Sequence, residues 1–276
     1  MQSQWSKYSL VNGEFLPAET ASLGIKDLSI QRGYGIFDFF KSIDGKFIFI
    51  DDHLERFYHS AAQMHLHVKQ RPEELKVLLQ ALMEKNELPN AGTRITLTGG
   101  YSADGYNLAE PNMIITQQAF KNPAFNNIGL KLITHPHQRQ LAEVKTLDYL
   151  MAIMLLPKVK EQGADDVLYH DGGMVRECPR ANFFMVSHHN EVITSATGIL
   201  QGVIRKQVLK LEINGLKIIE RDFSLHELKT CKEAFVTSST KNIMPVSSID
   251  GVSIGHGQAG QVTIELATAF SKLIAG

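Results

Sequence analysis

Short apolar runs divided by turn-forming dipeptides are the feature that most constrains the fold of this chain. Asp44-Gly45 lies between the apolar stretch 36–43 and the run 46–50, which is the pattern of a β-hairpin. Asn12-Gly13 marks a similar turn in the strand-like segment 8–15. Helical and strand-like segments follow one another without strict alternation, and this order favours an α+β fold over a doubly wound parallel sheet.

The spacing of apolar residues predicts the remaining elements. Predicted helices begin at Asp51 and at about Glu73, and cover residues 146–162 and 202–214. Predicted strands cover residues 93–98, 113–117, 129–134, 166–169, 182–186 and 234–237. The segment 121–127 is polar, contains a proline and lacks periodicity, so we expect it to be a linker.

The composition disfavours several classes of protein. A formal net charge of -1 over 276 residues gives no bias toward nucleic acid or an anionic membrane. Cys178 and Cys231 lack metal-ligand or redox spacing, so we expect no disulfide framework. The first residues lack the apolar core of a signal peptide, and no apolar run approaches a membrane span. We therefore expect a reduced, cytoplasmic protein without nucleic-acid or membrane partners.

Three motifs, in order, match the chemical needs of pyridoxal phosphate. Lys145 is followed 32 residues later by Glu177, and the glycine-containing run 198–202 then precedes a predicted helix. A lysine amine forms a Schiff base with the cofactor, a carboxylate keeps the ring nitrogen protonated, and a helix N-terminus binds the phosphate. Lys145 has three apolar neighbours, Val144, Leu147 and Leu150. Burial among them would lower the pKa of the lysine, as this chemistry requires.

The residues around these motifs resemble the fold-type IV (class IV) pyridoxal-phosphate aminotransferase family. The run Lys145-Thr146-Leu147-Asp148 is similar to the Lys-x-Leu-Asn pattern of D-amino-acid aminotransferases and aminodeoxychorismate lyases. It is less similar to the Lys-x-Gly-Gly-Asn-Tyr run of branched-chain aminotransferases. Glu177 and Asn182 match the family's Glu-x-x-x-x-Asn pattern. The resemblance covers nearly the whole chain, from the Arg32 region to the C-terminal helix.

The resemblance implies a two-domain organisation. It places a small N-terminal α/β domain at residues 1–120, an interdomain linker at 121–128 and a larger C-terminal cofactor-binding domain at 129–276. In this family the cofactor lies between the two domains. The resemblance also implies a homodimer in which the partner subunit contributes a loop to each site.

The resemblance further implies a role for each cofactor residue. Lys145 is the catalytic residue, Glu177 pairs with the pyridine nitrogen, and Asn182 supports the site structurally. Some relatives have threonine where this chain has Ile204, so only a backbone contact to phosphate carries over at that position. The full set of implied cofactor-binding residues is Arg56, Lys145, Glu177, Leu200, Val203, Ile204, Ser239 and Thr240.

The implied reaction moves an amino group between an amino acid, of the D or the branched-chain type, and a 2-keto acid. It proceeds through a Schiff base on Lys145, which also moves a proton at the substrate Cα. One alternative is an aminodeoxychorismate lyase that releases pyruvate and 4-aminobenzoate. Asp104 weakens this alternative, because the lyases' Arg-Gly-Tyr loop has arginine there. A non-catalytic pyridoxal-phosphate-binding protein is the second alternative.

The substrate carboxylate needs a cation, usually arginine. The arginine that D-amino-acid aminotransferases use would lie near Gly99, so this chain needs a replacement. The candidates are Arg94, which shares a strand face with Thr96, and Arg32, which precedes the run 33–35. For each, a surface ion pair is the alternative. Phe37 occupies the position where relatives place a bulky side chain against the substrate.

Two other patterns carry no function that we expect. Gly255–Gly260 spells the dinucleotide-binding fingerprint, but the 16 residues after it leave no room for a βαβ unit, so we expect a loop. Histidine pairs at 65/67, 135/137 and 188/189 lack a companion cluster of acids or cysteines. We therefore expect no metal site.

Overall fold

The computed structural model describes residues 6–213 and 215–275. The chain divides into two compact units: residues up to 122 together with 144–148, and residues 123–143 together with those from 149 onward. The segment 144–148, which contains Lys145, therefore packs with the first unit although it follows the expected linker in sequence. Among the described residues, no helix is both long enough and apolar enough to cross a membrane.

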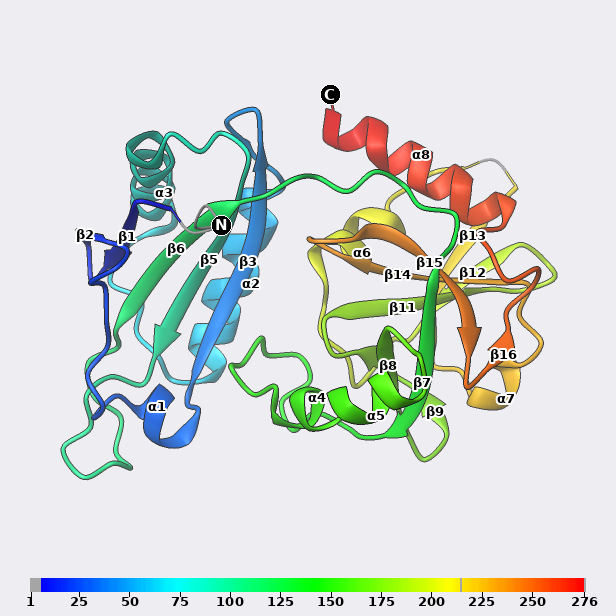
Figure 1. Cartoon of the computed structure of the whole chain (residues 1–276), viewed down its shortest axis with the longest axis horizontal. Helices are drawn as coiled ribbons and strands as arrows, with labels where there is room; N and C mark the ends of the chain where they lie inside the picture. Colours follow the sequence, from blue (N-terminus) through cyan, green and yellow to red (C-terminus); the bar gives the residue numbers. More distant parts are fainter. Residues whose placement is uncertain (1–5, 214, 276) are drawn as a thin grey trace. The chain divides into compact units, whose positions relative to one another are not determined.

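The first unit contains a six-stranded antiparallel sheet with the order β2-β1-β6-β5-β3-β4 (Figure 1). Its strands are β1 (Tyr8–Val11), β2 (Glu14–Pro17), β3 (Gly35–Ile43), β4 (Lys46–Phe47), β5 (Ala91–Thr98) and β6 (Met113–Ala119). Both predicted hairpin turns are confirmed. Asn12-Gly13 and Asp44-Gly45 each adopt two consecutive positive φ angles, the conformation that tight hairpins require.

The helices of the first unit are α1 (Leu28–Arg32), α2 (Ile50–Gln63) and α3 (Pro72–Asn86). The two longer helices pack on one face of the sheet, where Leu54 and Phe57 of α2 and Leu79 of α3 join a fully buried core with Ile95 and Ile115. Apolar residues alternate along β5 and β6, so the neighbouring residues of each strand point to the opposite face.

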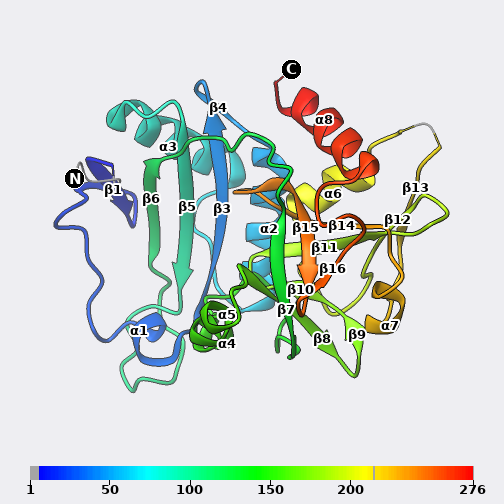
Figure 2. The ribbon, with the colours of Figure 1, turned by 45° about the vertical axis from the view of Figure 1, so that its right-hand side comes forward.

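The second unit contains a sheet with the order β13-β12-β11-β14-β15-β7-β8-β9, to which β10 adds at β11 and β16 at β15 (Figure 2). Its strands are β7 (Leu130–Pro136), β8 (Asp166–Asp171), β9 (Met174–Val175), β10 (Glu177–Cys178), β11 (Ala181–Val186), β12 (Glu191–Thr194), β13 (Lys217–Glu220), β14 (Glu233–Ser238), β15 (Asn242–Ile249) and β16 (Val252–Ser253). Its helices are α4 (Leu150–Met154), α5 (Leu156–Glu161), α6 (Val203–Leu209), α7 (Leu225–Leu228) and α8 (Gln261–Ala275). The pairs β12–β13, β15–β7 and β7–β8 are parallel, and the others are antiparallel.

Three predicted elements were wrong in extent. The helix expected over 146–162 begins only at Leu150, because residues 145–147 pair with β3, and it is divided at Leu155, just before Pro157. The helix expected over 202–214 ends at Leu209. The strand expected to reach residue 50 stops at Phe47, since α2 begins at Ile50.

Candidate active site

The backbone of Lys145 lies against the N-terminal end of β3. The N–H of Phe37 donates to the carbonyl of Lys145 at 3.0 Å, and the N–H of Leu147 donates to the carbonyl of Gly35 at 3.0 Å. On the other side, the N–H of Lys145 donates to Ser60 Oγ of α2 at 3.3 Å. A Cβ at Gly35 would lie 2.8 Å from Leu147 Cδ1, so glycine permits this close pairing. Lys145 is thus fixed by main-chain contacts to the first unit.

The immediate surroundings of Lys145 differ from the expected apolar pocket. Val144 is buried in the core of the first unit, but Leu150 is exposed, so the latter does not enclose the lysine. The ring of Phe37 lies below the amine instead, with Lys145 Nζ 4.5 Å from the ring centroid. Phe37 is itself buried.

Arg94 contacts the same aromatic ring as Lys145. Its guanidinium carbon lies 3.8 Å from the centroid of Phe37, and its Nε donates to Thr96 Oγ1 at 3.2 Å. The predicted shared face of Arg94 and Thr96 is therefore confirmed. The structure therefore brings Lys145, Phe37 and Arg94 together. Attraction between each cation and the aromatic ring helps to hold the two side chains in place.

Arg32 stands apart from this group in the described structure. It is the last residue of α1, its side chain is exposed, and its Nη1 donates to the carbonyl of Gln31 at 2.9 Å. The described contacts of Arg32 include none to Lys145, Phe37 or Arg94.

Arg56 lies on α2 and forms a two-point ion pair with Asp38 of β3. Its Nε donates to Asp38 Oδ2 at 2.8 Å and its Nη2 donates to Asp38 Oδ1 at 2.8 Å. His53 Nδ1 lies 2.7 Å from the same Oδ1 atom. Burial on its own would raise the pKa of Asp38, but the charges and hydrogen bonds of Arg56 and His53 outweigh it and hold that pKa well below its usual range. Asp38 is therefore a buried carboxylate ion.

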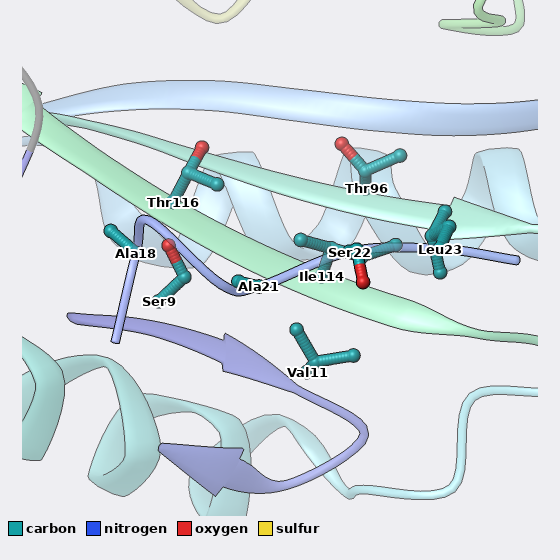
Figure 3. A pocket seen from close by; sticks show the side chains of 9 residues that line it. All are labelled: Ser9, Val11, Ala18, Ala21, Ser22, Leu23, Thr96, Ile114 and Thr116. Atoms are coloured by element: carbon teal, nitrogen blue, oxygen red, sulfur yellow. The ribbon is translucent and has the colours of Figure 1, made fainter. Parts of the chain in front are cut away.

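A pocket of about 380 Å³ lies on the sheet face opposite α2 and α3 (Figure 3). Its lining residues are Ser9, Val11, Ala18, Ala21, Ser22, Leu23, Thr96, Ile114 and Thr116. Thr96 joins this pocket to Arg94 through the hydrogen bond from the guanidinium. None of the lining residues is charged, so the pocket does not suit a phosphate group.

Glu177, in the second unit, is a buried carboxylate surrounded by donors. Arg139 Nε donates to Oε1 at 3.1 Å, whereas Asn182 Nδ2 and the N–H of Leu200 each donate to Oε2 at 3.1 Å. The side chain of Glu177 is 7% exposed. Three donors of this kind favour the ionised form, which is the form that a protonated pyridine nitrogen needs as a partner.

Asn182 connects Glu177 with the segment that enters α6. Its Nδ2 atom also donates to the carbonyl of Leu200 at 2.8 Å, and a Cβ at Gly202 would lie 2.0 Å from its Oδ1. Only glycine therefore allows the chain to pass so close to Asn182. Strand register places Glu177, Asn182 and Thr237 opposite one another on β10, β11 and β14.

The other second-unit residues expected at the cofactor lie at the start of α6 and just after β14. Val203 and Ile204 are the first two residues of α6, and both are buried. Ser239 and Thr240 follow the end of β14, where Thr240 Oγ1 lies 3.3 Å from Ser238 Oγ. The Thr237 hydroxyl is buried and has no hydrogen-bond partner among the described residues.

Each unit, taken by itself, holds groups of the kind that pyridoxal phosphate needs. The first unit supplies an amine at Lys145 and a guanidinium at Arg56, which suit an aldehyde and a phosphate. The second unit supplies the buried Glu177 carboxylate for the ring nitrogen and the unpartnered Thr237 hydroxyl. Asp38 and Arg139 were not predicted from the sequence. The position of Asp38 inside the otherwise largely apolar run 36–43 is the signal that could have indicated it.

Comparison with known proteins assigns the chain to a family. The family model of amino-transferase class IV matches residues 35–249, which is more than half of the chain. The D-alanine aminotransferase of Bacillus licheniformis is 30% identical over 273 residues, covering 96% of each chain. That of Listeria monocytogenes (strain F2365) is 29% identical over 275 residues, covering 96% of this chain and 95% of the relative. The chain belongs to the class IV aminotransferases.

Solved structures show the same fold. The branched-chain amino acid aminotransferase from Escherichia coli superposes with a TM-score of 0.89 at 23% identity, covering 98% of this chain and 94% of that chain. The one from Thermobaculum terrenum, in its PLP form, gives a TM-score of 0.88 at 20% identity, covering 99% and 95%. The predicted α+β fold of fold type IV and the predicted transferase class are confirmed.

Proposed function

We propose that this class IV aminotransferase uses pyridoxal phosphate to move an amino group between a D-amino acid and a 2-keto acid. The contact of Lys145 and Arg94 with one Phe37 ring carries the proposal, because it joins a reactive amine to a cation for a carboxylate. The match to D-alanine aminotransferases over 96% of the chain favours D-amino acids over branched-chain amino acids as substrates.

Lys145 is the catalytic residue in this proposal. When bound, pyridoxal phosphate supplies an aldehyde that takes up the amino group and an electron-poor ring that stabilises negative charge at the substrate Cα. Lys145 would hold the cofactor through its amine, and the same amine would move the proton at the substrate Cα. The Lys145 carbonyl accepts from the N–H of Phe37 and the Lys145 N–H donates to Ser60 Oγ, so the backbone that carries the amine is held beside Phe37.

The residues proposed to hold the cofactor come from both units. Glu177 binds the protonated ring nitrogen and is kept ionised by Arg139, Asn182 and Leu200. Leu200 borders the ring. The phosphate binds to Arg56, the backbone of Val203 and Ile204, and the hydroxyls of Ser239 and Thr240.

Arg94 is the preferred partner for the substrate carboxylate. Its guanidinium already lies against Phe37, beside which Lys145 places its amine. Phe37 contacts the substrate side chain, and its cross-strand partner Thr96 lines the uncharged pocket. Arg32 remains the second candidate for binding the substrate carboxylate. The homodimer that the family resemblance implies and the cytoplasmic location both remain predictions.

Single-turnover spectra with a panel of donors test the proposal. The purified protein loaded with cofactor should lose its long-wavelength absorbance on addition of D-alanine or D-glutamate, and recover it with a 2-keto acid. L-Leucine and L-valine should react at least about tenfold more slowly. Faster reaction with the L-amino acids would contradict the D preference. Pyruvate release from aminodeoxychorismate, without any keto-acid acceptor, would select the lyase reaction instead.

A further inference from the structure

The fork of Arg56 is only partly used by its described contacts. An arginine has five N–H donors in a rigid plane. The Nε–H and one Nη2–H point at the two oxygens of Asp38. Nη2 also lies 3.3 Å from His53 Nδ1. The edge formed by Nη1 and the second Nη2–H makes no described bond to a carboxylate, and the side chain remains 10% exposed. This second edge has the geometry that suits two oxygens of a phosphate.

Asp38 is itself held in place on the helix-facing side of β3. Its side chain is 1% exposed, and His53 Nδ1 lies 2.7 Å from its Oδ1 atom. Burial lowers the pKa of His53, an effect that Asp38 opposes and that the charges of Arg56 and Lys145 reinforce. The ring is therefore neutral near pH 7, and its Nδ1–H can donate to Asp38. Asp38 thus has one orientation relative to the Arg56 fork.

The same strand also fixes Lys145. Phe37, the residue before Asp38, points to the opposite face and donates its N–H to the carbonyl of Lys145. Adjacent residues of β3 therefore set the positions of the Arg56 guanidinium and of the Lys145 backbone. A shift of one would be transmitted through a single peptide unit to the other.

We propose that Asp38, supported by His53, is a positioning residue that aims the free edge of Arg56 at the phosphate of pyridoxal phosphate. This rests on the proposed phosphate role of Arg56. Asp38 carries a negative charge, so electrostatics alone predicts that its removal strengthens phosphate binding. Positioning predicts the opposite sign, because a freed guanidinium loses its orientation and must pay its rotamer entropy on binding.

The test compares two ligands of the apoenzyme, pyridoxal phosphate and pyridoxal, which differ only in the phosphate. Asp38→Asn should weaken pyridoxal phosphate binding about tenfold to a hundredfold, the range of one charge-assisted hydrogen bond, and change pyridoxal binding by less than about twofold. Equilibrium dialysis gives both dissociation constants. Unchanged or tighter binding of pyridoxal phosphate would overturn the proposal.

Asp27→Asn is the matched control. Asp27 is also a fully buried aspartate of the first unit, but it accepts from Ser29, Thr98 and Asn112 rather than from arginine. It should lower the melting temperature without changing the ratio of the two dissociation constants. A ratio that shifts equally in Asp27→Asn and Asp38→Asn would assign the effect to general destabilisation and overturn the proposal.

Two further variants separate this inference from the proposed function. Arg56→Lys keeps the charge but loses the fork, so it should change the ratio as Asp38→Asn does, and the double variant should add little more. An unchanged ratio in Arg56→Lys would remove the phosphate role itself. A changed ratio in Arg56→Lys with an unchanged one in Asp38→Asn overturns the positioning role alone. If Asp38→Asn does not fold, His53→Leu should shift the ratio in the same direction, and an unchanged ratio there overturns the proposal.

Discussion

The first unit presents cations to the proposed cofactor, whereas the second presents a carboxylate. In the first unit, Arg56 is oriented by a buried ion pair and Lys145 by main-chain pairing with β3. In the second, Glu177 is oriented by one arginine, one amide and one backbone N–H. The two sets match the opposite charges of phosphate and pyridinium. Each charged group is oriented by hydrogen bonds to residues of its own unit.

Glu177→Gln tests the anionic side of this comparison and should slow the reaction more than Arg94→Ala or Glu233→Gln. The amide cannot stabilise a protonated ring nitrogen, and a hydrogen bond to a charged group contributes about 1.5–3 kcal/mol. Since about 1.4 kcal/mol corresponds to tenfold, the rate of proton abstraction should fall about 10- to 150-fold. Stopped-flow half-reactions measure this rate, and a fully active Glu177→Gln enzyme would refute the role. Much of the bound cofactor should be retained.

Arg94→Ala removes the cation of the first unit that is proposed to bind the substrate carboxylate rather than the cofactor. Arg94 is half-buried, so the loss should lie between that of a buried and an exposed pair, about 1–2 kcal/mol. KM should rise about 5- to 30-fold for amino and keto acids alike, with little change for amines that lack a carboxylate. Arg32→Ala, at the exposed end of α1, is the comparison variant. A larger effect from Arg32 than from Arg94 would transfer the carboxylate role to Arg32.

Glu233→Gln sharpens the comparison by testing a buried carboxylate of the second unit with no proposed role in the reaction. Glu233 accepts from the N–H groups of Val262 and Thr263 and from the Thr263 hydroxyl, and so fixes the start of α8. The free energy of unfolding should fall by about 1–3 kcal/mol, measured by urea denaturation, while the half-reaction rate stays within about twofold. A rate loss as large as that of Glu177→Gln would mean that any buried carboxylate in this unit matters for the reaction.

Much of the fold follows from local patterns, whereas the contacts that orient the site do not. Asn12-Gly13 and Asp44-Gly45 predict their hairpins because a tight turn restricts its own residues. The residues 146 and 147 lie in a stretch with helical spacing, but pairing with β3 overrides it, and the bridge between Ile36 and Thr146 joins residues 110 positions apart. Arg139 and Asp38 were missed for the same reason. Each acts on a partner in another element, 38 positions away at Glu177 and 18 positions away at Arg56.

The position of the lysine that carries the cofactor tests the central claim most directly. Borohydride reduction of the cofactor-loaded protein, followed by proteolysis and mass spectrometry, locates the lysine that holds pyridoxal phosphate. Lys41 is the built-in comparison, because it is buried in the first unit and burial lowers its pKa to about 8, which also favours reaction with aldehydes. The account predicts the label on Lys145, with loss of the yellow colour in Lys145→Ala and its retention in Lys41→Ala. A label on Lys41, or an unlabelled Lys145 in active enzyme, would contradict it.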